Sequence, residues 1–401
     1  MSKDKQSPMH HFIVGFLRGL YKATFGLYLR LRYRLRCPGK SAVPKKGPCL
    51  LLANHSNNYD GLFLQYIIGR TISFVVTDAM FKNKTLGRLM SFVGYIPKRK
   101  HVTDSAAIRQ IIRAAKNNEI IGIFPEGGRN WDGKTGDISP ATFRLIKMLG
   151  IPVVTARIKG SYLSQPRWAE TKRRGIVEIE FNIHFADGRI PDLNTVSQTI
   201  SSALAHNEAL WQNERHISYK GKSLVKGLER LLYTCPSCKR IGTLSSTDDR
   251  LTCHICAASY RLDDYGFLHA VNAAAVMESI PAINDWQLSL LTERFIHAGN
   301  ATTLLTDDGA RLYCAKASSL PFEAEADGSL SLSKQSMLIG SRHFETARIH
   351  GAAVYFKSHL EFRYEGLDYR VGFEKSHVSA YKWNCALDAL NKIQGDLTNG
   401  D

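Results

Sequence analysis

The stretch CLLLANHSNNYDGLF, residues 49–63, sets an apolar run directly before a cluster of polar residues. The run 49–53 is short and uninterrupted, which is typical of a strand buried on both faces of a parallel sheet. Such a strand would deliver His55 to the carboxyl edge of the sheet, where parallel sheets place their sites. Asp60 follows at the expected start of a helix. The spacing allows two interpretations: a carboxylate that orients an imidazole for proton abstraction, or a helix cap beside a polar loop histidine.

Short apolar strands and amphipathic helices alternate from residue 48 to about residue 210. The expected strands are 49–53, 71–76, 120–124, 152–158 and 176–185. The expected helices are 61–68, 80–93, 104–117, 139–149 and 193–212. Strands that alternate with helices predict an α/β fold with a mostly parallel sheet flanked by helices.

Residues 9–36 form one long helical pattern that ends before the turn-forming CPGK. At about 100° per residue, four basic side chains gather on one side, and apolar and aromatic residues occupy much of the other. The four are Arg18, Lys22, Arg32 and Arg36. Such a helix can lie in the plane of a membrane surface, or it can pack on a core with its charged edge in solvent. Because no acidic residue lies among these cations, anionic lipid is favoured.

The chain of 401 residues carries a formal net charge of +17, which favours nucleic acid, anionic lipid or phosphorylated small molecules as partners. Four of its eight cysteines form two C-x-x-C pairs, which argues against a disulfide framework. The sequence shows no secretory signal and no uncharged apolar run of the ~18 residues that span a bilayer. We therefore expect a peripheral or monotopic protein on the cytoplasmic face of a membrane, without a transmembrane helix.

The two cysteine pairs are CPSC and CHIC, separated by fourteen residues. Their cysteines are Cys235, Cys238, Cys253 and Cys256. Two pairs at this spacing predict a zinc ribbon. Since four thiolates leave no open position on the metal, the zinc is expected to be structural, and His254 is expected to be a bystander.

Two further segments place charged residues after short apolar runs. IIGIFPEGGRNWDG (120–133) runs into Glu126, two glycines and Arg129, and glycine and arginine are residue types that hold phosphate oxygens. An ordinary strand-to-loop turn is the alternative. GYIPKRK (94–100) ends in a basic run, which by itself is more typical of solvated surface.

Together, four segments resemble the glycerolipid acyltransferase family, which includes 1-acylglycerol-3-phosphate acyltransferase. NHSNNYD matches the N-H-x4-D block of that family, and GYIPKR, FPEGGR and LGIPVVTA resemble its later blocks in the same order. The resemblance covers roughly residues 40–210. One departure is Gly128, which stands where the family usually has threonine or serine.

The resemblance implies an O-acyltransferase of phospholipid biosynthesis. It would move a fatty acyl group from acyl-CoA or acyl carrier protein to a lysophospholipid hydroxyl, with 1-acylglycerol-3-phosphate as the leading acceptor and no catalytic cofactor. His55 would be the general base and Asp60 its orienting partner. The basic residues implied at the acceptor phosphate are Lys98, Arg99 and Arg129. The residues implied at its glycerol are Glu126 and Gly127.

These observations divide the chain into four expected parts. They are a basic membrane-associating helix at 1–40, an acyltransferase domain at 41–215, a zinc ribbon at 228–268 and a strand-rich α+β module at 285–395. The last part faintly resembles pleckstrin-homology-like modules. The alternatives are a different lysolipid acceptor, motivated by Gly128, and a zinc-ribbon protein that binds nucleic acid. Nucleic acid is disfavoured because the ribbon itself is not strongly basic.

Overall fold

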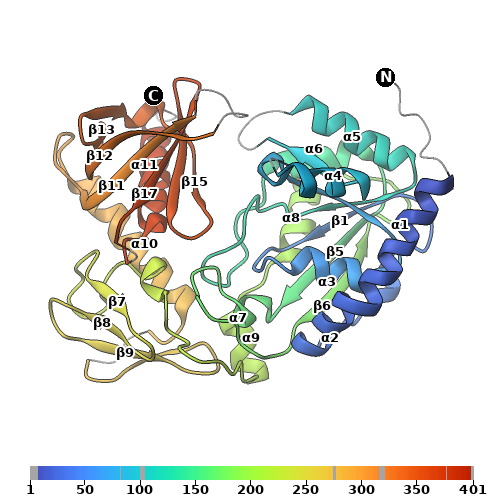
Figure 1. The fold of residues 1–401 in the computed structure, drawn as a ribbon, viewed down its shortest axis with the longest axis horizontal. Helices are drawn as coiled ribbons and strands as arrows, with labels where there is room; N and C mark the ends of the chain where they lie inside the picture. The colour runs from blue at the N-terminus through green and yellow to red at the C-terminus, as the bar shows by residue number, and fades with distance from the viewer. Residues whose placement is uncertain are drawn as a thin grey trace. The chain divides into compact units, whose positions relative to one another are not determined.

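The computed structural model describes residues 8–81, 83–99, 104–273, 277–315, 321–375 and 377–398. The chain divides into two compact units (Figure 1). The first contains Met1–Arg167 and Lys172–Lys220, and the second contains Trp168–Thr171 and Gly221–Asp401. The predicted mixed α/β class, with a mostly parallel sheet, a cysteine cluster and a strand-rich C-terminal part, is confirmed.

The first unit is built around a six-stranded sheet in the order β3-β2-β4-β1-β5-β6. The strands are β1 Cys49–Ala53, β2 Ile72–Thr77, β3 Ile96–Lys98, β4 Ile120–Ile123, β5 Val153–Lys159 and β6 Glu178–His184. Neighbouring strands are parallel except β5 and β6, which are antiparallel. The five predicted strands are present with ends shifted by at most two residues, and β3 is an edge strand that the sequence analysis does not predict.

Helices cover both faces of this sheet, because successive strand residues point to opposite sides. Odd-numbered residues of β1 share a buried cluster with α2 and α3. Even-numbered residues share the opposite cluster with α5, α6 and α8. The bounds are α2 Leu27–Tyr33, α3 Asp60–Ile67, α4 Lys84–Phe92, α5 Ser105–Lys116, α6 Pro140–Leu149 and α8 Leu193–Leu204. This sandwich leaves the carboxyl ends of the central strands accessible to loops.

The N-terminal helical segment is continuous, but it changes helix type along its length. It consists of α1 Pro8–Tyr21, a π-helical segment Lys22–Gly26, and α2. The prediction that the helix reaches residue 36 is wrong, because Arg34 has a left-handed backbone with φ 44° and ends α2. Among the described residues, no helix has both the length and the apolar character needed to cross a bilayer.

The single helix predicted over 193–212 is also wrong. It is divided into α8 and α9 Glu208–Arg215. Asn207 starts α9 by accepting hydrogen bonds from the N–H groups of the second and third residues after it, at 3.0 and 3.3 Å. The same residue forms an isolated antiparallel bridge with Lys134. Pairing with a distant segment therefore interrupts the helical pattern.

The second unit contains two antiparallel sheets. The smaller has the order β10-β9-β8-β7, and the larger has the order β14-β13-β12-β11-β17-β16-β15. The smaller sheet consists of β7 Leu244–Ser246, β8 Leu251–Cys253, β9 Ser259–Leu262 and β10 Leu268–Ala270. The larger consists of β11 Leu305–Ala315, β12 Glu323–Leu332, β13 Ser336–Ile339, β14 Arg342–Glu345, β15 His350–Tyr355, β16 His359–Tyr364 and β17 Leu367–Phe373.

Two helices fill the core of the larger sheet. α10 Ile280–His297 contributes Leu291 and Phe295, and α11 Ala380–Thr398 contributes Trp383. The sequence SAYKWNCALDALNKI (379–393) predicts the final helix of the α+β module, whereas α10 is not predicted. The strand-rich pattern begins after α10, at β11.

Candidate functional site

The loops after β4, β1 and β5 meet at one edge of the first sheet, because these three strands are adjacent and parallel. His55 lies in the loop after β1, and Asp60 is the first residue of α3. The Nδ1 atom of His55 lies 2.9 Å from Oδ2 of Asp60. The imidazole stacks on Phe124, with ring centroids 4.1 Å apart. The side chain of His55 is 21% exposed, whereas that of Asp60 is fully buried.

Asp60 accepts hydrogen bonds on both carboxylate oxygens. Oδ2 accepts from the backbone N–H groups of Ser56 and Asn57, at 2.7 and 2.8 Å, as well as facing the imidazole. Oδ1 accepts from the hydroxyl of Ser161 at 2.5 Å. Because Oδ2 already accepts two N–H groups, the remaining hydrogen bond places a proton on Nδ1 of His55. This tautomer leaves Nε2 unprotonated and able to accept a proton.

Glu126 fastens the loop after β4 to the loop after β1. Its Oε1 accepts from the backbone N–H of His55 at 2.6 Å, and its Oε2 accepts from the N–H of Gly136 at 2.8 Å. Burial raises the pKa of Glu126 to about 8, and these two donors act in the opposite direction. One oxygen therefore holds the backbone of His55, and the other holds the backbone of Gly136. A direct contact of Glu126 with the glycerol of an acceptor remains a prediction.

Arg129 follows two glycines in the loop after β4. Gly127 has φ 72°, in the left-handed region that favours glycine, whereas Gly128 lies outside that region. A Cβ added at Gly128 would meet nothing within 4 Å, so the position has room for a side chain. Burial lowers the pKa of Arg129, and the Asp60 carboxylate opposes this shift. Within the described ranges, the guanidinium has no hydrogen-bond or ion-pair partner.

Lys98 and Arg99 lie at the same sheet edge but farther out. Lys98 ends β3, which β2 separates from β4, and both basic side chains are exposed. The backbone N–H of Arg99 donates to Oδ2 of Asp104 at 3.0 Å, and its Nε lies 3.7 Å from the same oxygen. The guanidinium is therefore drawn toward the N-terminal cap of α5.

Several buried polar residues that the sequence analysis does not single out complete the site. Asn54 donates to the carbonyl of Ile158 at 2.8 Å and accepts from its N–H at 2.6 Å, which ties β1 to β5. Asn57 donates to the carbonyl of Ser161 at 3.1 Å. Gly160 and Ser161 come directly after β5, and a glycine followed by a serine signals the end of a strand in the sequence. Only the strand order, however, reveals that this end lies beside His55.

The four paired cysteines of the second unit form one cluster. Their four Sγ atoms all lie within 4.8 Å of one another. The Sγ atoms of Cys235 and Cys256 are 3.7 Å apart, as are those of Cys238 and Cys253. Four sulfurs bound tetrahedrally at about 2.3 Å from zinc would be about 3.8 Å apart. The donor set therefore fits zinc, and exposed His254 is not part of it.

The two cysteine pairs adopt the same backbone turn. The N–H of Cys235 donates to the carbonyl of Arg240, and the N–H of Cys253 donates to that of Ala258, each at 2.9 Å. In both turns the residue four positions after the first cysteine has a left-handed backbone, with φ 58° at Lys239 and φ 57° at Ala257. Two equivalent turns facing each other are a second observation that fits a four-thiolate metal site.

Comparison with known proteins adds to this geometry. Residues 34–159 match the family described as Acyltransferase. A chloroplastic 1-acyl-sn-glycerol-3-phosphate acyltransferase of Brassica napus is 24% identical over 164 residues, which cover 40% of this chain and 45% of that relative. A chloroplastic enzyme of the same description from Arabidopsis thaliana is 23% identical over 164 residues, 40% of this chain and 44% of the relative. The chain thus spans less than half the length of these two relatives.

One solved structure is also similar, the crystal structure of the 1-acyl-sn-glycerophosphate acyltransferase PlsC from Thermotoga maritima. It is 19% identical, covers 50% of this chain and 82% of its own, and has a TM-score of 0.41. The matched region of this chain, 34–159, includes the His55–Asp60 pair and the loop of Glu126 and Arg129. This part of the chain is therefore similar to glycerolipid acyltransferases.

Proposed function

We propose that the first unit transfers a fatty acyl group from a thioester donor to the hydroxyl of a lysophospholipid, with 1-acylglycerol-3-phosphate as the leading acceptor. The observation that carries the proposal is the His55–Asp60 pair: Asp60 fixes Nδ1, and Nε2 has no partner among the described residues. The relatives whose names specify 1-acyl-sn-glycerol-3-phosphate acyltransferase support the choice of acceptor.

In the proposed reaction, Nε2 of His55 removes the proton from the acceptor hydroxyl as the oxygen attacks the thioester carbonyl. The carbon–sulfur bond breaks as the ester bond forms, and His55 returns the proton to the leaving thiolate. Asp60 stabilises the imidazolium that forms between these steps. The donor is acyl-CoA or acyl carrier protein, and the step needs no metal or organic cofactor.

The partly buried guanidinium of Arg129 is the proposed phosphate site. It lies in the loop after β4, next to the loop of His55, and the charge of the Asp60 carboxylate acts to raise its pKa. Arginine binds phosphate oxygens through paired N–H groups, and this guanidinium, without a partner among the described residues, supplies them. Lys98 and Arg99 are proposed to attract the phosphate from farther out along the same edge. Gly128 leaves open space where the family usually has a threonine or serine. A lysolipid without a free phosphate is therefore the second acceptor class to test.

Replacing Arg129 by glutamine tests the function and the acceptor together. We expect wild-type protein to acylate lysophosphatidic acid, and the variant to lose about 10-fold to 100-fold in kcat/KM, the range for a hydrogen bond to a charged group. Transfer to a monoacylglycerol, which has no phosphate, should change little. The measurement is thioester consumption with a panel of lysolipids in detergent.

Arg189→Gln is the matched control, because Arg189 is an exposed arginine of the same unit whose side chain is 91% exposed. An equal loss on both acceptors in Arg129→Gln would contradict the phosphate site. Wild-type protein no more active than His55→Ala on every lysolipid would overturn the acyltransferase proposal itself.

We also propose that the N-terminal helical segment lies on the membrane surface, on the cytoplasmic face. Leu29 and Tyr33 pack in the core, but apolar side chains on another side of the segment are exposed: Phe12 is 71%, Phe16 is 64% and Leu31 is 67% accessible. The alternative, a helix that packs this face on a core, does not describe these side chains. Part of the basic side faces the protein instead, since Arg18 donates to the Thr71 hydroxyl at 3.4 Å. An exposed apolar face together with uncompensated positive charge is what an in-plane helix presents to anionic lipid.

The double substitution Phe12→Asp and Phe16→Asp is expected to weaken binding to anionic phospholipid vesicles by tenfold or more. Burying one such aromatic side chain contributes about 1.5–3 kcal/mol, and tenfold in affinity corresponds to about 1.4 kcal/mol. The measurement is co-sedimentation with vesicles. Leu210→Asp, at a position 62% exposed on α9, is the matched control. Equal binding by the double variant and the wild type would refute the placement.

For the second unit we propose a structural zinc on the four cysteines. Along the chain, an acyltransferase domain at 41–215 would then be followed by a ribbon at 228–268 and a separate strand-rich module at 285–395.

A further inference from the structure

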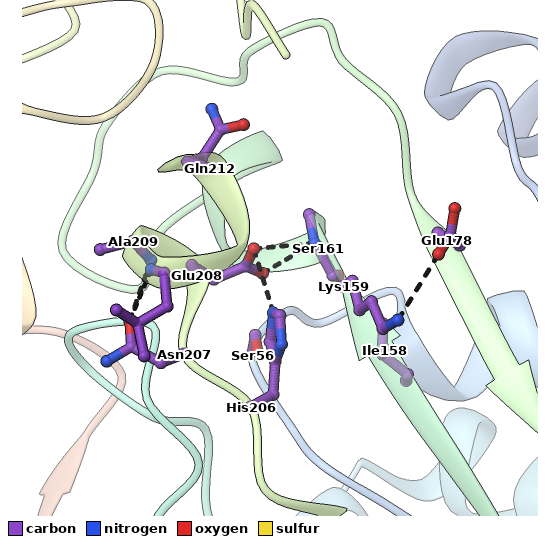
Figure 2. A network of polar contacts seen from close by, with 12 residues as sticks. Ser56, Ile158, Lys159, Ser161, Glu178, His206, Asn207, Glu208, Ala209 and Gln212 are labelled. Carbon is purple, nitrogen blue, oxygen red and sulfur yellow. Dashed lines mark hydrogen bonds and ion pairs between the residues drawn. The ribbon is translucent and has the colours of Figure 1, made fainter. Parts of the chain in front are cut away.

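A second buried carboxylate, Glu208, is linked to the His55–Asp60 pair through Gly160 and Ser161, and it has no part in the proposed reaction. It is the first residue of α9, and its side chain is 2% exposed. Both carboxylate oxygens accept from the backbone N–H of Gly160, at 2.8 and 3.0 Å. Figure 2 shows Glu208 pointing from its helix toward the turn that carries Ser161, with His206 beside it. His206 Nε2 lies 3.2 Å from the carboxylate but is poorly aligned for a hydrogen bond.

The turn at Gly160, which Glu208 holds, is connected to Asp60 through the next residue, Ser161. Gly160 connects β5 to the short helix α7 Ser161–Ser164 and has φ 75°. A Cβ at Gly160 would collide with the Tyr219 hydroxyl and the Ile176 carbonyl, so this position accepts only glycine. The next residue, Ser161, is fully buried and donates its hydroxyl to Oδ1 of Asp60.

The segment around Glu208 also reaches His55 by a second route. Thr135 exchanges two hydrogen bonds with His206, and the N–H of Glu208 donates to the carbonyl of Gly133 at 3.0 Å. The adjacent Gly136 donates to Glu126, which holds the backbone N–H of His55. The two routes form a closed ring of hydrogen bonds that restrains both the loop and the side chain of His55.

We propose that Ser161 and Glu208 are positioning residues for the His55–Asp60 pair. Glu208 fixes the Gly160 turn, and the Ser161 hydroxyl then fixes the rotation of the Asp60 carboxylate, so that Oδ2 stays directed at Nδ1 of His55. A group that locks the orientation of a catalytic side chain acts on the rate without touching the substrate. The inference rests on the proposed acyl transfer, and both residues lie outside the matched region 34–159.

Steady-state kinetics of Ser161→Ala and Glu208→Ala test this proposal. We expect kcat to fall about 10-fold to 100-fold, the range for a hydrogen bond to a charged group, while KM for the lysolipid changes little. Glu208→Gln should recover most of the rate, because its amide oxygen still accepts from Gly160 N–H. Thr155→Val is the matched control. It also removes a fully buried hydroxyl, but this hydroxyl lies on β5, 2.9 Å from His184, and does not contact Asp60.

A second measurement separates positioning from the function itself. In histidine-labelled full-length protein, the NMR signal of the His55 Nδ1 proton should shift or broaden in Ser161→Ala and Glu208→Ala and stay in place in Thr155→Val. An unchanged signal with unchanged kcat, or losses that Thr155→Val reproduces, would overturn the proposal. If wild-type protein transfers no acyl group, the proposed function fails, and the NMR signal alone decides the positioning role.

Discussion

His55→Ala is expected to lower kcat for acyl transfer by about 100-fold to 10,000-fold, the usual contribution of a positioned general acid–base group. The loss should appear in kcat, because the imidazole acts on the proton that moves in the transition state. The fold should persist. Among the described residues, the partly exposed side chain makes one hydrogen bond. The hydrogen bonds that hold its loop come from backbone atoms of His55: its N–H donates to Glu126, and its carbonyl accepts from the N–H of Asn130.

Asp60→Asn provides the contrast to this variant. Asp60 accepts hydrogen bonds from Ser56, Asn57 and Ser161 as well as facing His55, so an amide NH2 group at this position would meet donors. We expect a loss of about 2–5 kcal/mol in the free energy of unfolding in addition to lost activity, because buried donors are left unsatisfied. His55→Ala with a wild-type melting temperature and full activity would refute the general-base role.

The sequence predicts those features of the site that are local. The apolar run of β1, the polar residues after it and the helix start at Asp60 are continuous in the chain, so one stretch contains the information that pairs imidazole and carboxylate. The cysteine cluster is predicted for a similar reason, since each C-x-x-C pair lies within one turn and one hairpin joins the two. The apolar strands are recognisable because a central parallel strand is buried on both faces.

Features that depend on distant partners are not predicted. β3 is three residues long and becomes a strand only by pairing with β2. The helical pattern of 193–212 is broken where Asn207 pairs with Lys134, and the sequence around either residue does not indicate this pairing. Glu208 directly follows that break, and its partner Gly160 is 48 positions away. The positioning residues of a site therefore become visible only in the folded chain, even where the reacting pair is evident from the sequence.

Removing the proposed zinc from the second unit is the other change with a large expected effect. We expect purified protein to contain one zinc per chain, and both chelation and Cys235→Ser to unfold the region around β7–β10. These strands have only three or four residues each, so the small sheet buries little surface without the four thiolates. Metal binding in such small sites contributes about 10–16 kcal/mol of folding free energy, which the apo form lacks. Elemental analysis, and hydrogen exchange along residues 235–270, would measure both effects.

Cys314→Ser is the matched control, because Cys314 is a half-buried free cysteine of the same unit outside the cluster. Four thiolates complete a tetrahedral zinc site and leave no position for substrate, so chelation should spare the chemical step of acyl transfer in the first unit. A disulfide is the competing chemistry, since the sulfurs of Cys235 and Cys256 lie 3.7 Å apart before any metal is considered. Metal-free protein that keeps full exchange protection in β7–β10 under reducing conditions would show that the cysteines need no zinc. Loss of protection together with zinc, while turnover continues, would show that the cluster holds the fold of its own unit and takes no part in the reaction.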